Sequence, residues 1–191
     1  LSIDVEGYRL GSHGRTAPLS FTTQLKANGT SVTGFPANLQ TGTLAGRTTT
    51  LPFYLWELVL HPRMPVLNIH IPAGDPFTPE TISESLSKAK AFFAERDYPY
   101  RFALCESWLL DVNLARFLPN DGNIVSFMRR FFKLPCHSLD EPSILRWVMR
   151  RDFCKRELAS FQPQSKLQKA LMEYLLTGGQ VFDTLGFLEL V

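Results

Sequence analysis

The chain has 191 residues, and its 20 basic and 18 acidic residues give a net charge of +2. A charge this near neutral argues against binding nucleic acid through its phosphates, and no apolar run reaches the roughly 18 residues needed to span a bilayer. Cys105, Cys136 and Cys154 form no C-x-x-C pair, which argues against a disulfide framework and a metal site. The cysteine pattern favours a cytoplasmic protein, and 45% apolar residues predict one sizeable core. We expect neither nucleic acid nor a membrane as a partner.

The chain begins with leucine rather than methionine, and no signal peptide is visible. We therefore expect it to be part of a longer protein. The missing N-terminal part is then a partner of the folded region and can hold substrate-binding residues.

Residues 1–52 are rich in Gly, Thr, Ser and Asn and carry short apolar alternations. Ile3 to Tyr8 predicts a strand, and Asn28-Gly29 predicts a two-residue hairpin turn. No helical stripe occurs in this region. The sequence therefore predicts a β-rich N-terminal segment, residues 1–47, followed by a second domain, residues 48–191.

Two strand-length apolar runs, 56–60 and 66–71, flank a turn with two prolines. The pattern predicts an antiparallel hairpin in which Glu57 lies opposite Asn68. Because opposite residues share a face, we expect Glu57, Asn68 and His70 to cluster and to line a cleft. The other face is expected to be apolar core, formed by Trp56, Leu58, Leu60, Leu67, Ile69 and Ile71.

A helix is predicted over residues 79–95. Thr78 is a favoured N-cap, Pro79 suits the first helical position, and apolar residues follow at intervals of four, three and four. A strand precedes this helix and another follows it, with short connections. We therefore predict a βαβ unit in which strands 66–71 and 100–106 are parallel neighbours that diverge toward their C-terminal ends.

The rest of the chain is mainly helical in pattern. Capping-box patterns at Ser138 and Ser165 open two helices, the second of which ends at Gly178-Gly179. The remaining predicted elements are helices at 111–118 and 123–131 and strands at 132–134 and 185–190.

Several strings of residues occur together along the chain. They are Trp56-Glu57-Leu58-Val59-Leu60, Asn68 to Gly74, Cys105-x-Ser107-Trp108-Leu109-Leu110, Leu118 to Ile124, and Leu167 to Leu188 with its paired glycines. Together they resemble a bacterial family usually described as GNAT-like acyltransferase-domain proteins, from about residue 30 to the end. The resemblance implies a GCN5-related N-acetyltransferase fold: an α/β (α+β) mixed sheet with splayed central parallel strands, helices on both faces and a β-rich N-terminal segment. Domains of this fold usually begin with a strand and two helices, which the first residues here lack.

The resemblance also implies acyl transfer to an amine from acyl-CoA or an acyl-carrier-protein thioester. Such a site needs a base and an oxyanion donor. Glu57 or His70 is the expected base, although a hydrogen-bonded pair that fixes the sheet is the structural alternative. Glu106 and Ser107 are further catalytic candidates, because ligands bind at the C-terminal ends of parallel strands. The family commonly has a histidine where this chain has Glu106.

The loop before the predicted helix corresponds to a pyrophosphate-binding loop, in which N–H groups of a helix N-terminus hold the anion. Asp75 and Glu80 would repel a pyrophosphate. We therefore expect the pantetheine arm to be bound but free coenzyme A to be held weakly, without a metal. Cys105 is interpreted as an apolar filler rather than a nucleophile. The residues expected to contact the thioester are Ile71, Ala73, Gly74, Thr78 and Cys105.

Two other functions stay open. One is a binding or regulatory module that has kept the sheet and lost turnover. The other is a scaffold for the missing N-terminal part, with no small ligand. Thiol release from acyl thioesters would separate acyl transfer from both, and a ligand cleft after strand 66–71 would separate the binding module from the scaffold.

Overall fold

The computed structural model describes residues 5–10, 19–72, 74, 76–138, 141–149 and 155–190. They form a five-stranded antiparallel sheet and a four-stranded mixed sheet. The first sheet, in the order β4-β3-β2-β1-β5, consists of β1 (Val5–Leu10), β2 (Leu19–Asn28), β3 (Ser31–Ala37), β4 (Thr49–Pro52) and β5 (Trp56–Leu60). The second, in the order β6-β7-β9-β8, consists of β6 (Leu67–Asn68), β7 (Phe102–Ser107), β8 (Phe132–Ser138) and β9 (Asp183–Glu189).

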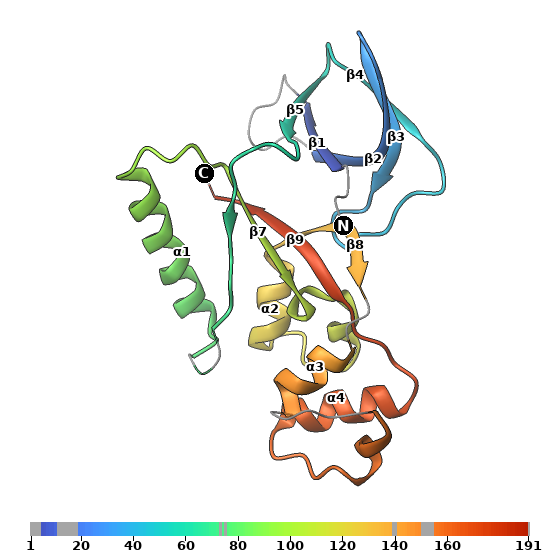
Figure 1. The fold of residues 1–191 in the computed structure, drawn as a ribbon, viewed down its shortest axis with the longest axis vertical. Coiled ribbons are helices and arrows are strands. Elements are labelled where there is room, and N and C mark those ends of the chain that lie inside the picture. Colours follow the sequence, from blue (N-terminus) through green and yellow to red (C-terminus); the bar gives the residue numbers. More distant parts are fainter. Residues whose placement is uncertain are drawn as a thin grey trace.

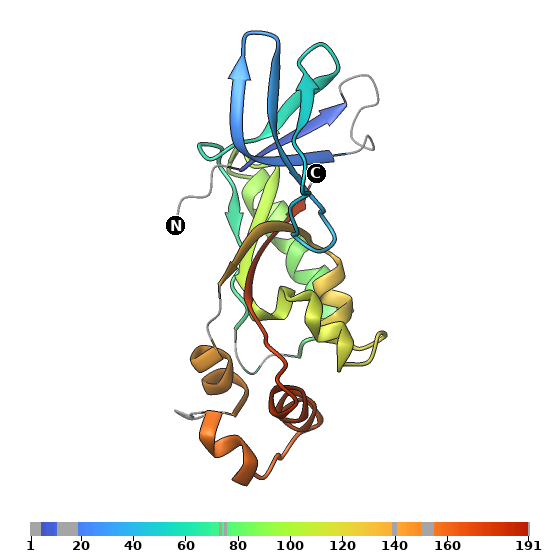
Figure 2. The ribbon, with the colours of Figure 1, turned by 90° about the vertical axis from the view of Figure 1, so that its right-hand side faces the viewer.

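The helices alternate in the chain with the strands of the four-stranded sheet, and the last strand, β9, follows α4. In both views the five-stranded sheet lies at one end of the molecule and α3 and α4 lie at the other (Figure 1, Figure 2). The α-helices are α1 (Pro79–Ala94), α2 (Asn123–Arg129), α3 (Glu141–Met149) and α4 (Lys166–Leu176). The 3-10 turns are η2 (Trp108–Leu110), η3 (Val112–Arg116) and η4 (Lys155–Ser160).

The β-rich character of the N-terminal region is confirmed, and within 5–10 and 19–72 no helix is present. The predicted turn at Asn28-Gly29 joins β2 to β3, and the Asn28 side chain accepts hydrogen bonds from the N–H groups of Thr30 and Ser31 at 3.0 and 2.8 Å. β4 and β5, which lie beyond residue 47, also belong to this sheet. It therefore continues as far as Leu60.

The predicted hairpin between 56–60 and 66–71 is wrong. β5 pairs with β1, with Glu57 opposite Arg9, while β6 pairs with β7 in the other sheet. The proline-containing stretch between them carries the chain from one sheet to the next. Its local hydrogen bonds run to His61, from Met64 N–H to the carbonyl at 3.0 Å and from Arg63 N–H to Nδ1 at 3.2 Å. Two apolar runs around a turn predict pairing with each other, but β1 competes for the same edge of β5.

The predicted apolar face of β5 is also wrong. Tyr8 pairs with Leu58 and Gly7 with Leu60, so Val59 is an extra residue in β5, as in a β-bulge. The bulge shifts the alternation by one position. Val59 and Leu60 are consequently both buried, whereas the Leu58 side chain is 43% exposed.

The βαβ prediction is confirmed. β6 and β7 are parallel neighbours, and α1 crosses over between them. Thr78 is the N-cap of α1, and its side chain and that of Thr81 form a reciprocal capping box. The apolar stripe of α1 packs against the sheet through Ile82, Leu86 and Phe93.

The two faces of the four-stranded sheet have different covers. One face lies against α1 and α2, and its core, called here the helix-side core, consists of Leu67, Ala103, Cys105, Leu110, Phe127, Phe131, Leu188 and Leu190. The other face packs against the end of β5 in a second core, formed by Val59, Leu60, Phe102, Leu134 and Phe187. Alternate residues of each strand therefore face helices or the five-stranded sheet.

A third core joins α3, α4 and η4 at the far end. The capping box predicted at Ser165 is present, with Gln168 as its second member, and Gly178 ends the segment with φ 87°. The helix expected after Ser138 is present as α3, which is described from Glu141, whereas a capping box at Ser138 predicts a start at residue 139. Residues 139–140 and the Ser138 side chain lie outside the described residues. The helix predicted over 111–118 is instead the 3-10 turn η3.

Candidate active site

β6 and β7 separate soon after they meet. They pair at Leu67–Ala103 and Asn68–Leu104, and one more hydrogen bond runs from Ile69 N–H to the Leu104 carbonyl, at 2.7 Å. β7 then continues to Ser107, whereas residues 69–72 are no longer in a strand. The predicted divergence is therefore confirmed. It opens a strand cleft of about 470 Å³ between residues 69–72 and 105–109.

The cleft exposes main-chain groups of β7. Because Ile69 N–H bonds to the Leu104 carbonyl, the main-chain groups of residue 104 point toward β6. Those of Glu106, two residues further on, point the same way. Among the described residues, no main-chain hydrogen bond joins 70–72 to 105–108. The Glu106 N–H and C=O thus face the cleft without a strand partner.

Asn68 and His70 point to the face away from α1. Ile69 and Ile71 pack with the helix-side core, so the intervening residues project to the opposite side. Asn68 Nδ2 lies 3.1 Å from His70 Nε2. An amide nitrogen only donates, so Nε2 accepts, and the neutral imidazole carries its proton on Nδ1. The predicted cluster therefore holds for these two residues.

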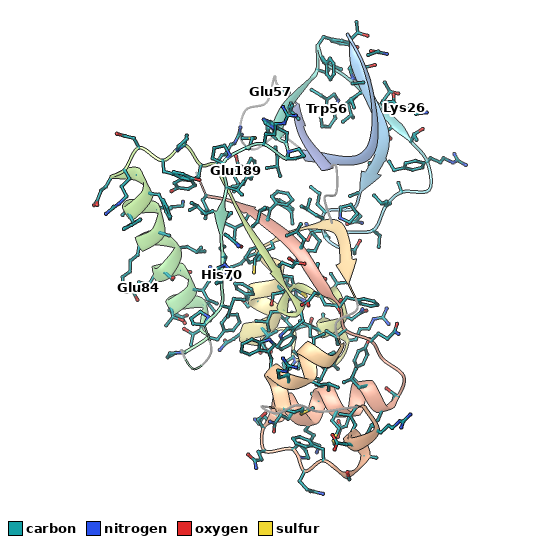
Figure 3. The ribbon with its side chains drawn as sticks, in the orientation of Figure 1. Lys26, Trp56, Glu57, His70, Glu84 and Glu189 are labelled. Carbon is teal, nitrogen blue, oxygen red and sulfur yellow. The ribbon has the colours of Figure 1, made fainter. Side chains whose placement is uncertain are left out.

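Glu57 does not join them. It is exposed on β5, and Figure 3 shows it on the five-stranded sheet, well away from His70. The predicted grouping of Glu57 with Asn68 and His70 is wrong, because it rested on the hairpin register. The carboxylates that line the cleft are those of Glu106 and Asp183. Glu106 lies next to Cys105 of the helix-side core and so points to the same face as His70.

Ser107 and Cys105 also border the cleft. The Ser107 hydroxyl accepts a hydrogen bond from Leu109 N–H at 3.2 Å and caps η2, which leaves its own proton free to be donated. Burial raises the pKa of the Cys105 thiol to about 12, and the Glu106 charge adds to the effect. A thiol of this kind is protonated at neutral pH, which argues against a cysteine nucleophile.

A second cavity, the helix pocket, lies between α1, α2 and the other side of residues 69–72, with a volume of about 290 Å³. Arg130 lies at its edge. The Arg130 Nη2 donates to the Pro79 carbonyl at 3.1 Å and to the Ser83 hydroxyl at 3.0 Å. The walls are mainly apolar and include Ile69, Ile71, Phe77, Ile82, Leu86 and Phe127.

The N-terminus of α1 is occupied by its own side chains. Thr78 accepts from Thr81 N–H at 3.3 Å. The pKa of Glu80 is lowered by a hydrogen bond from its own N–H, by one from Thr78, and by the Arg130 charge. This carboxylate therefore stays ionised where an anionic ligand would bind. Gly74 has φ 98°, and Ala73 and Asp75 lie outside the described residues.

Arg130, Trp147 and Asp183 line these cavities and were not predicted as site residues from the sequence. Arg130 stands outside the apolar stripe of α2, and nothing in the pattern shows that it reaches α1. Trp147 lines the strand cleft although its side chain is 65% exposed. The sequence does contain a signal for Trp147. This large aromatic residue stands between the apolar pairs Ile144-Leu145 and Val148-Met149, at a helical position off the buried stripe of α3.

Within the described ranges, no group of three or more His, Cys, Asp or Glu side chains is placed to hold a metal ion. The helices of the same ranges include none that is long and apolar enough to cross a membrane.

Comparison with known proteins gives one family and several solved structures. The family model described as the GNAT-like C-terminal domain matches residues 10–188. Among curated proteins, no sequence matches the chain.

The similar structures are all acyltransferase complexes. One, in complex with decanoyl-CoA, is 26% identical with a TM-score of 0.59, and the match covers 87% of this chain and 46% of that one. Another, in complex with CoA and 10C-teicoplanin, is 24% identical with a TM-score of 0.54, covering 87% and 47%. This chain thus spans about half the length of the structures that it matches.

Proposed function

Because the chain belongs to the family of GNAT-like C-terminal domains, we propose that it transfers an acyl group from a coenzyme A-type thioester to an amine. The observation that carries this proposal is the parting of β6 and β7, which leaves the Glu106 N–H and C=O facing the strand cleft. A pantetheine arm contains two amides, and an amide N–H of the arm can donate to the Glu106 C=O as another strand would, which leaves the Glu106 N–H for the thioester carbonyl.

The two cavities together form a continuous binding region for the donor in this proposal. The helix pocket and the strand cleft share residues 69–72 and lie on opposite sides of them. We place the pantetheine arm along this segment, with its phosphate end toward Arg130 and its thioester in the strand cleft. The apolar walls of the helix pocket suit the methyl and methylene groups of the arm. This path brings the carbonyl to the face that carries His70 and Glu106.

The chemistry requires one bond to form and another to break. The amine nitrogen attacks the thioester carbonyl, a C–N bond forms, and the C–S bond breaks to release a thiolate. The Glu106 carboxylate takes the proton from the amine. The Glu106 N–H stabilises the oxyanion. Glu106 then passes the amine's proton to the leaving thiolate, to which the Ser107 hydroxyl donates a hydrogen bond. His70 is the second candidate for the base, but its Nε2 is already engaged by Asn68.

The similar structures include complexes with decanoyl-CoA and one with octanoyl-CoA. We therefore propose that the transferred acyl group is of medium chain length. A thiol-release assay tests the function, with acetyl-, octanoyl- and decanoyl-CoA and the matching acyl-pantetheines, each with and without an amine. We expect amine-dependent release that is faster with the longer chains. Thioester binding without release would instead indicate the inactive binding module, and neither binding nor release would refute the proposal.

The phosphate end of the donor is expected to contribute little affinity. Glu80 stays ionised beside the N-terminus of α1, and Asp75 precedes it in the chain. The double change Asp75→Asn and Glu80→Gln should tighten coenzyme A binding by about threefold, because two repulsive charges are removed. Titration calorimetry measures this change. Glu84→Gln, one turn further along α1, is the matched control and should leave the affinity unaltered. Equal affinities for wild type and double variant would show that the phosphates bind elsewhere.

A further inference from the structure

Trp147 lies on α3 outside the buried apolar stripe of that helix. Its neighbours on α3, Ile144, Leu145, Val148 and Met149, are all buried in the third core. Trp147 itself keeps 65% of its surface exposed, yet it borders the strand cleft together with Trp108. An indole left open at the mouth of a cavity offers a flat apolar face for a ligand ring.

The helix that carries Trp147 is anchored. The Gln168 side chain donates from Nε2 to the Val148 carbonyl at 3.0 Å and accepts from Gln164 N–H at 2.7 Å through Oε1. Gln168 is itself buried and is part of the capping box of α4. The main chain beside Trp147 is therefore held in place before any ligand arrives, which reduces the entropy that binding must lose.

The cleft is acidic where Trp147 meets it. Among the described residues that line it, Glu106 and Asp183 are carboxylates and none is lysine or arginine. Opposite charges attract an ammonium into such a cleft and repel phosphate. The acidic cleft therefore suits the acceptor amine better than the nucleotide end of the donor, whose cationic neighbour Arg130 is in the helix pocket.

We propose that the strand cleft selects an acceptor in which an ammonium is joined to a flat apolar ring, with the ring on Trp147 and the ammonium beside Glu106. This inference rests on the proposed acyl transfer, since it identifies the second substrate of that site. Trp147 is a specificity-determining residue in this arrangement. The ring contact fixes the acceptor while Glu106 takes its proton.

Binding of phenethylamine, measured without any thioester, tests the inference separately from turnover. Indole N–H signals are followed by NMR in the labelled chain, and the Trp147 signal is assigned as the one missing from Trp147→Phe. We expect phenethylamine to shift this signal. Neutral 2-phenylethanol and ring-free propylamine should each bind at least about fivefold more weakly, because each lacks one of the two contacts.

Trp147→Ala should weaken phenethylamine binding by about fivefold, and Trp147→Phe by less than about threefold, because phenylalanine keeps a ring. Tyr54→Ala is the control, since Tyr54 is an exposed aromatic residue in the turn between β4 and β5 and lies outside the cleft. It should change nothing. Equal affinity of wild type and Trp147→Ala, equal binding of 2-phenylethanol, or no binding by wild type would each overturn the inference. Thiol release without Trp147-dependent binding would refute this site alone.

Discussion

Glu106→Gln is expected to lower kcat for acyl transfer by about 100- to 1000-fold, the usual effect of removing a general base. The amide keeps the size of the side chain and leaves the main-chain N–H and C=O in place, so donor binding should be unchanged. The acceptor KM should rise only a few-fold, because one charge near the ammonium is lost. Steady-state thiol release together with calorimetric titration of the donor separates these three quantities.

Glu57→Gln is the matched control for that experiment. It removes a carboxylate of the same kind from a position that the sequence also indicated, but which lies on the five-stranded sheet. Its rate should equal that of wild type. A full rate for Glu106→Gln, combined with a loss in His70→Ala, would transfer the role of base to His70. A loss in Glu57→Gln would mean that a part of the five-stranded sheet reaches the substrate.

The sequence was sufficient where the structure follows from local signals. Thr78 and Pro79 mark the start of α1 and Ser165 that of α4, since a cap satisfies N–H groups within one turn. The parallel pairing of β6 and β7 was also predictable, because a strand-helix-strand segment with short connections has few other ways to close. One carboxylate of the cleft was also predictable, because the sequence places Glu106 at the end of the second parallel strand.

What the sequence could not show is which distant segments meet. The partner of β5 is β1, about fifty residues earlier, and no local pattern distinguishes that pairing from a hairpin with β6. The bulge at Val59 then buried Val59 and left Leu58 exposed, whereas Leu60 stayed buried. Trp147 reaches the cleft from a helix beyond β8, so only the assembled fold brings it to Glu106.

A buried lysine is a further feature that the sequence did not reveal. The side chain of Lys133 on β8 is 1% exposed, and its Nζ donates to the carbonyls of Phe131, at 2.7 Å, and Met128. Both carbonyls lie at the C-terminal end of α2, where a cation is favoured by the helix dipole. Burial outweighs that attraction and lowers the pKa of Lys133 from 10.5 to about 8.

The free energy of unfolding of wild type, relative to Lys133→Met, is therefore expected to rise as the pH increases from about 8 to about 10.5. Below this interval both the folded and the unfolded chain hold the proton, so the folded state bears the full cost of a buried ammonium. Within it the folded chain has lost the proton and the unfolded chain still binds it, which makes stability increase with pH. The neutral amine keeps two N–H donors, enough for both carbonyl partners.

At about 1.4 kcal/mol for each pKa unit, the relative gain in stability should be about 2–3 kcal/mol between about pH 7.5 and about pH 10.5. Urea denaturation of wild type and variant at a series of pH values measures it, and the difference between the two cancels groups that titrate in both. Lys169→Met is the control. Lys169 is exposed on α4, so this substitution removes an equal charge from the surface and not from the core. Its difference from wild type should stay constant. A constant difference for Lys133→Met as well would mean that water reaches Lys133 in the folded state and that its ammonium is not buried.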